Sequence, residues 1–261
     1  MASNKSWQKI FKDNKILEHD FSKGPFYLSA KDIKKSVQNF KKTNEKEVRI
    51  LCKQDSRKDV PDIMQKNNLI LLPVKNGEYI LVRGEGYIDI PEISGEAEKY
   101  YGKIVFHLDS SEVGNSEMQH LDFAYANSLI RTFMQDETLV LTIRGRKYTP
   151  EFDFIINKQK IKVRSVQTEV DAGYEGRDKI VLVEAKNSKT KDTIIRQLYY
   201  PYRQWAEYTN KEIFLLFFEK RGREYLIWQY IFTDKYDYNS VKLAKAKKYR
   251  IVSKNNEKFK K

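Results

Sequence analysis

The 261-residue chain contains 49 Lys and Arg against 36 Asp and Glu, which gives a net charge of +13. A hydrophobic content of 40% with 13% aromatic residues excludes a disordered chain, and a single cysteine, Cys52, excludes a disulfide scaffold. No apolar run approaches the roughly 20 residues of a transmembrane helix, and the N-terminal residues have no apolar signal core, so we expect a cytoplasmic protein.

Positive charge is concentrated toward the C-terminal end. Residues 242–261 contain nine Lys or Arg side chains and a single acid, Glu257. A basic segment on a basic chain favours a polyanionic partner, because contact with phosphates releases counterions. A solvated lysine-rich end has the same composition. The charge therefore favours a nucleic-acid partner without excluding this simpler explanation. No basic amphipathic helix accompanies the segment, which makes a membrane surface the less favoured partner.

The first part of the chain is expected to be mainly helical. Ser29 and Asp32 form a capping-box pattern that predicts a helix continuing to about Lys41. Residues 48–52 (VRILC) have the aliphatic composition of a short strand. Residues 60–67 follow as a short helix, with a proline early in it, where proline is tolerated.

A hairpin is expected next, at residues 69–84, where two apolar runs flank Asn76-Gly77. Helices followed by a hairpin are the order of a winged-helix module, in which Arg57 and Lys58 would face DNA and the hairpin would be the wing. An ordinary α+β subdomain that packs on the rest of the chain has the same order. Both interpretations stay open at this point.

The second half predicts a more regular alternation of helices and strands. After an acidic connection at 85–115, apolar spacing predicts one helix over 116–135, and another is expected over about 190–209. Strands are expected at 139–144, 148–156, 161–171, 179–186, 213–218 and 224–232. This order predicts an α/β (α+β) core with a mixed sheet flanked by helices. We expect an N-terminal α+β region at residues 1–100 and the core, with its basic tail, at 101–261.

One buried strand ends abruptly in charged residues. Residues 180–183 (IVLV) form a continuous apolar run, which Glu184 and Lys186 follow. Because these two are two residues apart, their side chains project from the same face of the strand. Asp171 ends the preceding strand and would lie beside Glu184 if the two strands pair antiparallel. Buried charges are costly unless they are paired or used, so we expect a site where two carboxylates and a lysine converge.

The chemistry of these groups points to metal-assisted hydrolysis of a phosphodiester. Two hard oxygen ligands with open positions suit Mg²⁺, and a lysine beside them could orient or deprotonate the attacking water. A loop containing Gly173 and Gly176 would let the chain turn back between the strands. Asp153 is the rival first acid, but it lies a whole hairpin away from the second strand. Glu169 shares a strand face with Asp171 and could assist it or form an ion pair with a nearby cation.

These residues and their surroundings resemble the PD-(D/E)XK nucleases. The pattern consists of Asp171, twelve intervening residues, and then Glu184-Ala-Lys186, on two adjacent strands between two helices. The resemblance in the order of elements covers residues 116–232, and it is strongest with type II restriction endonucleases. The chain departs from the family pattern at Val170, which stands where proline gives the family its name.

The resemblance implies a role for each of these residues. Asp171 and Glu184 would be Mg²⁺ ligands, assisted by the backbone carbonyl of Ala185. Lys186 would position and activate the attacking water. The implied products are DNA ends that carry a 5′-phosphate and a 3′-hydroxyl.

The segment after the second strand is crowded with aromatic and basic side chains. In nucleases that this chain resembles, the corresponding helix often carries Gln or Tyr near the site, which implies Gln197 and Tyr200 as supporting residues. Arg203 could bind a phosphate in a bidentate manner, although the same segment could instead form a packing face against the sheet. Glu117 opens the preceding helix, where some nucleases carry a metal-assisting acid, but a favourable charge in the first helical turn is the preferred explanation.

Three functions are compatible with this pattern. We favour a Mg²⁺-dependent type II restriction enzyme that cuts double-stranded DNA, as a homodimer if its site is palindromic. A repair or structure-selective nuclease of the same fold and a non-catalytic winged-helix regulator are the alternatives. The intact triplet Asp171, Glu184 and Lys186 argues against the regulator. Residues 84–86 lack the spacing of a phosphate-binding glycine loop, so no nucleotide cofactor is expected.

Overall fold

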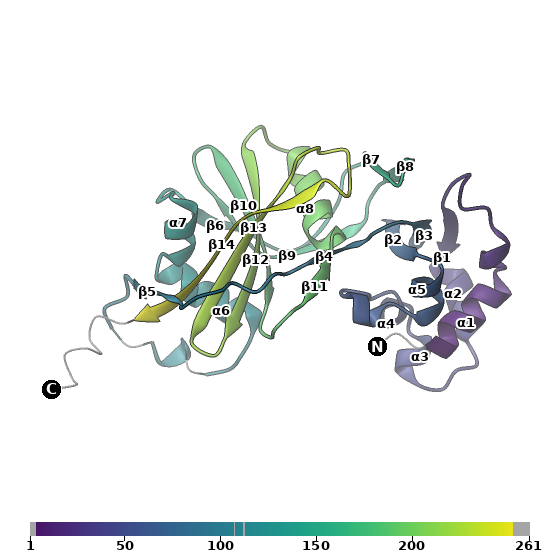
Figure 1. Cartoon of the computed structure of the whole chain (residues 1–261), viewed down its shortest axis with the longest axis horizontal. Coiled ribbons are helices and arrows are strands. Elements are labelled where there is room, and N and C mark those ends of the chain that lie inside the picture. Colours follow the sequence, from purple (N-terminus) through teal and green to yellow (C-terminus); the bar gives the residue numbers. More distant parts are fainter. Residues whose placement is uncertain (1–3, 107, 112, 253–261) are drawn as a thin grey trace.

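The computed structural model describes residues 4–106, 108–111 and 113–252. Figure 1 shows a large twisted sheet with helices on its faces beside a smaller module of short helices and strands at the N-terminus. Helix α8 (Arg196–Ala206) lies between the two parts. The expected mixed α/β class is therefore confirmed. Among the described residues, none of the helices combines the length and the apolar composition that a membrane crossing requires.

The N-terminal module, residues 4–83, is built around a buried apolar core. Its regular elements are α1 (Asn4–Asp13), β1 (Phe26–Ser29), α2 (Ala30–Val37), α3 (Thr43–Lys46), α4 (Val48–Leu51), α5 (Asp62–Lys66), β2 (Leu69–Lys75) and β3 (Glu78–Arg83). The capping box is confirmed, because Asp32 N donates to Ser29 Oγ at 3.1 Å and Ser29 N donates to Asp32 Oδ2 at 3.2 Å. Trp7 is fully buried, and its Nε1 donates to the Leu51 carbonyl at 3.2 Å, which ties α1 to α4.

The predicted hairpin is confirmed, whereas the short strand predicted before it is wrong. Strands β2 and β3 pair antiparallel on either side of the turn, and β1 adds to β3. Gly77 has a φ of +76° in this turn, a conformation that favours glycine. Residues 48–52 are helical instead, because their backbone bonds are local: Cys52 N donates to the Val48 carbonyl at 2.8 Å. A short apolar run fits a strand or a buried helical turn equally well.

The large sheet has the strand order β5-β14-β13-β12-β10-β9-β6. Its strands are β5 (Glu98–Tyr101), β6 (Val140–Tyr148), β9 (Gln167–Glu175), β10 (Lys179–Lys186), β12 (Glu212–Arg221), β13 (Glu224–Phe232) and β14 (Val241–Val252). β10 and β12 run parallel, with α8 in the connection between them, and β14 and β5 are also parallel. The other neighbours are antiparallel, so the sheet is mixed. Two short ribbons flank it: β4 (Tyr87–Asp89) with β11 (Asp192–Ile194), and β7 (Phe152–Ile156) with β8 (Gln159–Val163).

Helices cover both faces of this sheet. Helices α6 (Glu117–Ala126) and α7 (Leu129–Met134) share one buried cluster with Val181 and Val183 of β10. Leu182 of β10 packs on the opposite face, in a cluster with Leu198 of α8. Alternate residues of β10 are therefore buried on opposite faces, which explains the continuous apolar run in its sequence.

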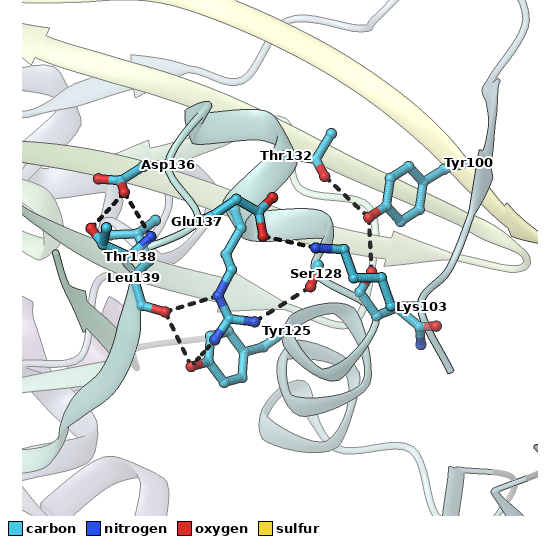
Figure 2. Close-up of polar contacts among 11 residues, drawn as sticks. Tyr100, Lys103, Tyr125, Ser128, Thr132, Asp136, Glu137, Thr138 and Leu139 are labelled. Atoms are coloured by element: carbon cyan, nitrogen blue, oxygen red, sulfur yellow. Dashed lines mark hydrogen bonds and ion pairs between the residues drawn. The ribbon is translucent and has the colours of Figure 1, made fainter. Parts of the chain in front are cut away.

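The helix predicted over 116–135 is interrupted between α6 and α7. The break lies at Ser128, whose φ of +62° is left-handed. The Tyr100 hydroxyl, from β5, donates to the Asn127 carbonyl at 2.8 Å. It also lies 3.1 Å from Thr132 Oγ1, and Figure 2 shows these two side chains next to each other. A strand that is distant in the sequence therefore binds the backbone at the break, which the local apolar spacing did not reveal.

The basic C-terminal segment and the acidic connection both contain strands of the large sheet. Residues 241–252 form β14, between β13 and β5, so this part of the expected free tail is a paired strand. Residues 253–261 lie outside the described residues. The connection at 85–115 contains β4 and β5, so the boundary placed after residue 100 falls inside a strand of the large sheet.

Candidate active site

Asp171 and Glu184 are neighbours on the antiparallel pair β9–β10. The pairing aligns Ala172 with Val183, and the next residues along the two strands are Asp171 and Glu184. Asp171 Oδ2 accepts a hydrogen bond from the Ala185 backbone N–H at 2.8 Å. The expectation that antiparallel pairing brings these two residues together is confirmed. Asp171 lies within β9 rather than at its end, because the strand continues beside β6.

Gly173 lies inside strand β9 and not in the loop where it was expected. A Cβ atom at this position would lie 2.6 Å from Cβ of Ile143 on β6, a distance that real contacts do not reach. Glycine therefore lets β6 approach β9 next to Asp171. The chain turns back around Gly176 instead, whose N–H donates to the Lys179 carbonyl at 2.8 Å.

Lys186 shares a strand face with Glu184, and its ammonium donates a hydrogen bond to Glu184 Oε1. Glu184 is only 9% exposed, and this burial raises its pKa to about 7; Lys186 opposes the rise and Asp171 adds to it. Burial also raises the pKa of Asp171, against the effects of the Ala185 N–H and of Lys186. Burial by itself would lower the pKa of Lys186, but the adjacent Glu184 outweighs it and the pKa lies above its ordinary value. One ammonium therefore does not compensate two buried carboxylates.

The donor set fits a hard divalent cation. The carboxylates of Asp171 and Glu184 offer oxygen ligands, and a cation between them would relieve the cost of burying two like charges. Ala185, expected to contribute its carbonyl, lies on β10 directly after Glu184. Within the described ranges, no group of three or more His, Cys, Asp and Glu side chains is arranged for a metal. Two carboxylates with otherwise open positions suit Mg²⁺, which keeps several waters.

The triplet opens onto a cleft between the N-terminal module and the large sheet. The cleft has a volume of about 1040 Å³, and its lining includes Asp171, Glu184 and Lys186. On the opposite side, the N-terminal module contributes four cations, Arg49, Lys53, Lys58 and Lys75, here called the module wall, and two acids, Asp55 and Asp59. Catalytic candidates and basic side chains from distant parts of the sequence therefore face one space.

The expected supporting residues also line this cleft. Glu169 forms an ion pair with Arg146 at 3.2 Å, which agrees with the alternative that it pairs with a nearby cation. Gln197 accepts a hydrogen bond from Thr193 Oγ1 at 2.7 Å. Tyr200 lines the cleft as well, but its hydroxyl donates to a carbonyl of β2 at 2.9 Å and thereby joins α8 to the N-terminal module.

Glu117 is more closely associated with the site than its position in a first helical turn suggested. It lines the cleft, and its charge contributes to the raised pKa of Lys186. Ser116 caps the helix, with its Oγ accepting from Gln119 N at 3.1 Å. Glu117 therefore combines a favourable helix position with a place beside the triplet.

Two family comparisons cover this arrangement. Residues 82–250 match the family described as Domain of unknown function (DUF6997), and residues 4–81 match a second one, Domain of unknown function (DUF6996). The chain belongs to the DUF6997 family. No curated protein and no solved structure matches the chain. The DUF6997 part contains the triplet, whereas the part that matches DUF6996 supplies the module wall.

The two neighbouring residues expected to face DNA have different surroundings. Lys58, at the centre of the 3-10 turn η2 (Arg57–Asp59), is exposed and lines the cleft. Arg57 instead forms ion pairs with Asp89 at 2.6 Å and with Glu85 at 3.6 Å, both in the DUF6997 part. The expected DNA contact is therefore compatible with Lys58, while Arg57 is engaged in holding the two parts together.

Arg203 is buried, and the expectation that it binds DNA phosphate is wrong. Its side chain is 2% exposed, and Nη1 donates to the Asp153 carbonyl at 2.6 Å and to the Lys235 carbonyl at 3.2 Å. The guanidinium lies 4.8 Å from the ring centre of Phe152. α8 turns this residue toward the ribbon β7–β8 and away from the cleft, so the packing interpretation applies.

Asp153, the rival first acid, is separate from the triplet. It lies on β7 and forms an ion pair with Lys160 of β8 at 2.8 Å, which lowers its pKa. It is not among the residues that line the cleft. Asp171 is thus the acid that the strand pairing brings next to Glu184.

Five cationic residues of the cleft were not selected from the sequence: Arg49, Lys53, Lys75, Arg146 and Arg196. Arg146 lies on β6, and Arg196 opens α8 at 4.0 Å from Asp55 of the N-terminal module. No local pattern distinguishes these residues in a chain with 33% charged residues. For Arg196, its position directly before Gln197 was the one sequence feature that could have indicated a place near the site.

Proposed function

We propose that the chain is a Mg²⁺-dependent endonuclease of the PD-(D/E)XK type that cuts double-stranded DNA as a type II restriction enzyme. The observation that carries this proposal is the close association of Asp171, Glu184 and Lys186. Asp171 is bonded to the N–H of Ala185, and Glu184 is bonded to Lys186, at one edge of a mixed sheet that borders a cleft. Metal-assisted hydrolysis of a phosphodiester needs such a combination of oxygen ligands and a cationic side chain.

The arrangement of elements around the triplet supports the same proposal. β9 and β10 pair antiparallel, and β10 continues through α8 into the parallel strand β12. Helices α6 and α7 precede these strands and pack on the other face. This is the order of elements in which the sequence resembles the nucleases.

Each residue of the triplet has a defined part in the proposed reaction. Asp171 and Glu184, with the carbonyl of Ala185, would hold Mg²⁺. When bound, the ion would supply Lewis-acid stabilisation of the charge that develops on the phosphate. Lys186 would donate hydrogen bonds that orient the attacking water and the phosphate, because its ammonium lies beside Glu184 on the same strand face.

Cleavage of unmodified phage DNA tests the proposal. The wild-type chain and Glu184→Ala are incubated with the DNA in Mg²⁺ and in EDTA. Discrete Mg²⁺-dependent bands that disappear in the variant support a site-specific nuclease that uses this site. A Mg²⁺-dependent smear indicates the repair or structure-selective nuclease instead. No cleavage, with salt-sensitive DNA binding that Glu184→Ala leaves unchanged, overturns the enzyme proposal in favour of the DNA-binding regulator.

The proposal includes a homodimer for a palindromic site, because two-fold symmetric DNA is bound by a two-fold symmetric protein. Sedimentation of the chain alone and with a cleavable duplex measures the stoichiometry. Two chains per duplex support the homodimer, and one chain per duplex argues for independent cutting of each strand.

A further inference from the structure

The module wall contains two basic side chains that are free of ion pairs. Arg49 and Lys58 are both exposed and line the cleft, and across the described part of the chain neither is within ion-pair distance of a carboxylate. The other two cations of the wall differ from them: Lys53 lies 3.5 Å from a carboxylate oxygen of Asp55, and Lys75 lies 3.0 Å from Glu78. Arg49 and Lys58 are thus the wall cations whose charge is available to a ligand.

The turn that carries Lys58 is fixed to the opposite part of the molecule. Arg57 N donates to Asp192 Oδ1 at 2.6 Å, and Ile194 N donates to the Asp55 carbonyl at 2.9 Å. The first bond connects the turn, and the second connects the residues just before it, to strand β11, which precedes α8. A side chain on such an anchored turn loses less conformational freedom when it binds a ligand than one on a free loop.

Several acids that line the cleft are already bonded to neighbouring groups. Glu169 is paired with Arg146 at 3.2 Å, Asp55 lies 3.5 Å from Lys53, and Asp59 accepts a hydrogen bond from the Ser56 hydroxyl at 2.8 Å. Asp171 and Glu184 lie where the proposed cation would bind. A DNA strand with one phosphate at the triplet would have neighbouring phosphates opposite the module wall. Arg and Lys contacts to such phosphates fix the position of the strand without reading its sequence.

We propose that Arg49 and Lys58 form a phosphate-binding wall, and that the DNA strand to be cut runs between this wall and the triplet. Arg49 would bind a phosphate with its planar guanidinium, and Lys58 would act as a point charge. Arg57 is a positioning residue that holds the turn and does not contact DNA. The identity of the polyanion as duplex DNA rests on the proposed function.

Binding without cleavage tests this wall. Fluorescence anisotropy measures the affinity of the full chain for a labelled duplex in EDTA, over a series of KCl concentrations. Each of Arg49→Ala and Lys58→Ala is expected to lower the salt slope, −d log K/d log [KCl], by about 0.9, because one phosphate contact is lost. The same relation predicts a loss in affinity of about eightfold per variant at 0.1 M salt.

The matched control is the pair Lys34→Ala and Lys35→Ala, which removes two exposed positive charges on α2, outside the cleft. This double variant is expected to keep the wild-type salt slope. A control that loses as much as Arg49→Ala with Lys58→Ala shows a general charge effect and overturns the wall. Wall variants that bind like the wild type, or a wild-type chain that does not bind the duplex, also overturn it. Thermal melting checks that all variants fold.

Failure of the wall and failure of the nuclease proposal give different results. If the chain never cleaves DNA, but Arg49→Ala and Lys58→Ala lower the salt slope, the wall is supported as a DNA-binding surface and the nuclease proposal is overturned. If the chain cleaves DNA in Mg²⁺, and the two wall variants bind and cleave like the wild type, the nuclease proposal is supported and the phosphate-binding wall is overturned.

Discussion

The proposed catalytic edge, formed by Asp171, Glu184 and Lys186, and the module wall face each other across one cleft, but different kinds of contact hold their charged side chains. In the edge, Glu184 is bonded to Lys186 and Asp171 is bonded to the backbone N–H of Ala185, all within a pair of consecutive strands. The wall is exposed, and its position depends on bonds such as Arg57 N to Asp192, which join residues 135 positions apart. Burial concentrates electrostatic interactions and suits chemistry, whereas exposed free cations suit the binding of a solvated polyanion.

The largest effect is expected at the catalytic edge. Glu184→Gln should lower the rate of DNA cleavage by about 10³-fold, because a buried ligand charge is lost. The variant should not melt below the wild type, since a neutral amide avoids the cost of burying this charge, which is visible in its pKa of about 7. Single-turnover cleavage in Mg²⁺ and thermal melting in EDTA give the two measurements.

Glu169→Gln is the matched control for that variant, because Glu169 is exposed and paired with Arg146. It should retain cleavage within about tenfold of the wild type. Equal losses of cleavage in both variants would contradict a specific role of Glu184 as a metal ligand. They would show that cleavage depends only on the total negative charge near the triplet.

A large loss of stability without a loss of binding is expected for Arg203→Met. The change leaves the carbonyls of Asp153 and Lys235 without their buried donor, at a cost of about 3 kcal/mol in the free energy of unfolding. Urea denaturation measures this cost, and the exposed Arg223→Met is the control, with a change of about 0.5 kcal/mol or less. If a folded Arg203→Met chain binds DNA more weakly than the wild type, the interpretation that Arg203 of α8 contributes to DNA binding is supported again.

The thiol of Cys52, which is half-buried in the lining of the cleft, reports on packing beside the module wall. Burial raises its pKa to about 12, and the residue packs against the core of the N-terminal module. At pH 8 the native thiol should react with a disulfide reagent on the order of fiftyfold more slowly than the unfolded chain in urea, after allowing for the greater nucleophilicity of a more basic thiolate. The native rate should rise with pH throughout the range below about 12. Equal native and unfolded rates at pH 8 would show that the native structure does not protect the Cys52 thiol.

The smallest effect concerns the backbone beneath the catalytic edge. Gly173→Ala should lower the free energy of unfolding by about 2 kcal/mol, because the new Cβ would clash with Ile143 of β6. Gly24→Ala is the control, since no atom lies within 4 Å of a Cβ built there. Urea denaturation distinguishes the two, and equal stabilities would show that β6 shifts freely away from β9.

Local patterns predicted well that Asp171, Glu184 and Lys186 lie together, and predicted the surrounding elements less well. The run 180–183 followed by Glu184 and Lys186 predicted both the strand and the shared face, because strand alternation is a property of neighbouring residues. The helix predicted over 116–135 was wrong in its continuity, because Tyr100 of a distant strand binds the backbone at the break. Residues 242–252 were expected to lie in a basic tail. Their many lysines gave no sign of a strand, which forms by pairing with β13 and β5.

The sequence by itself determined the mixed α/β class, the N-terminal capping box and hairpin, and the pairing of Asp171 with Glu184. All of these depend on residues that are close in the chain, whose spacing sets which side chains share a face. Only the tertiary structure decided which basic residues face the cleft. Arg57, Lys58 and Arg203 look alike as cations in the sequence, but the packing of α8 and the docking of η2 on β4 and β11 bury or pair two of them and leave Lys58 free.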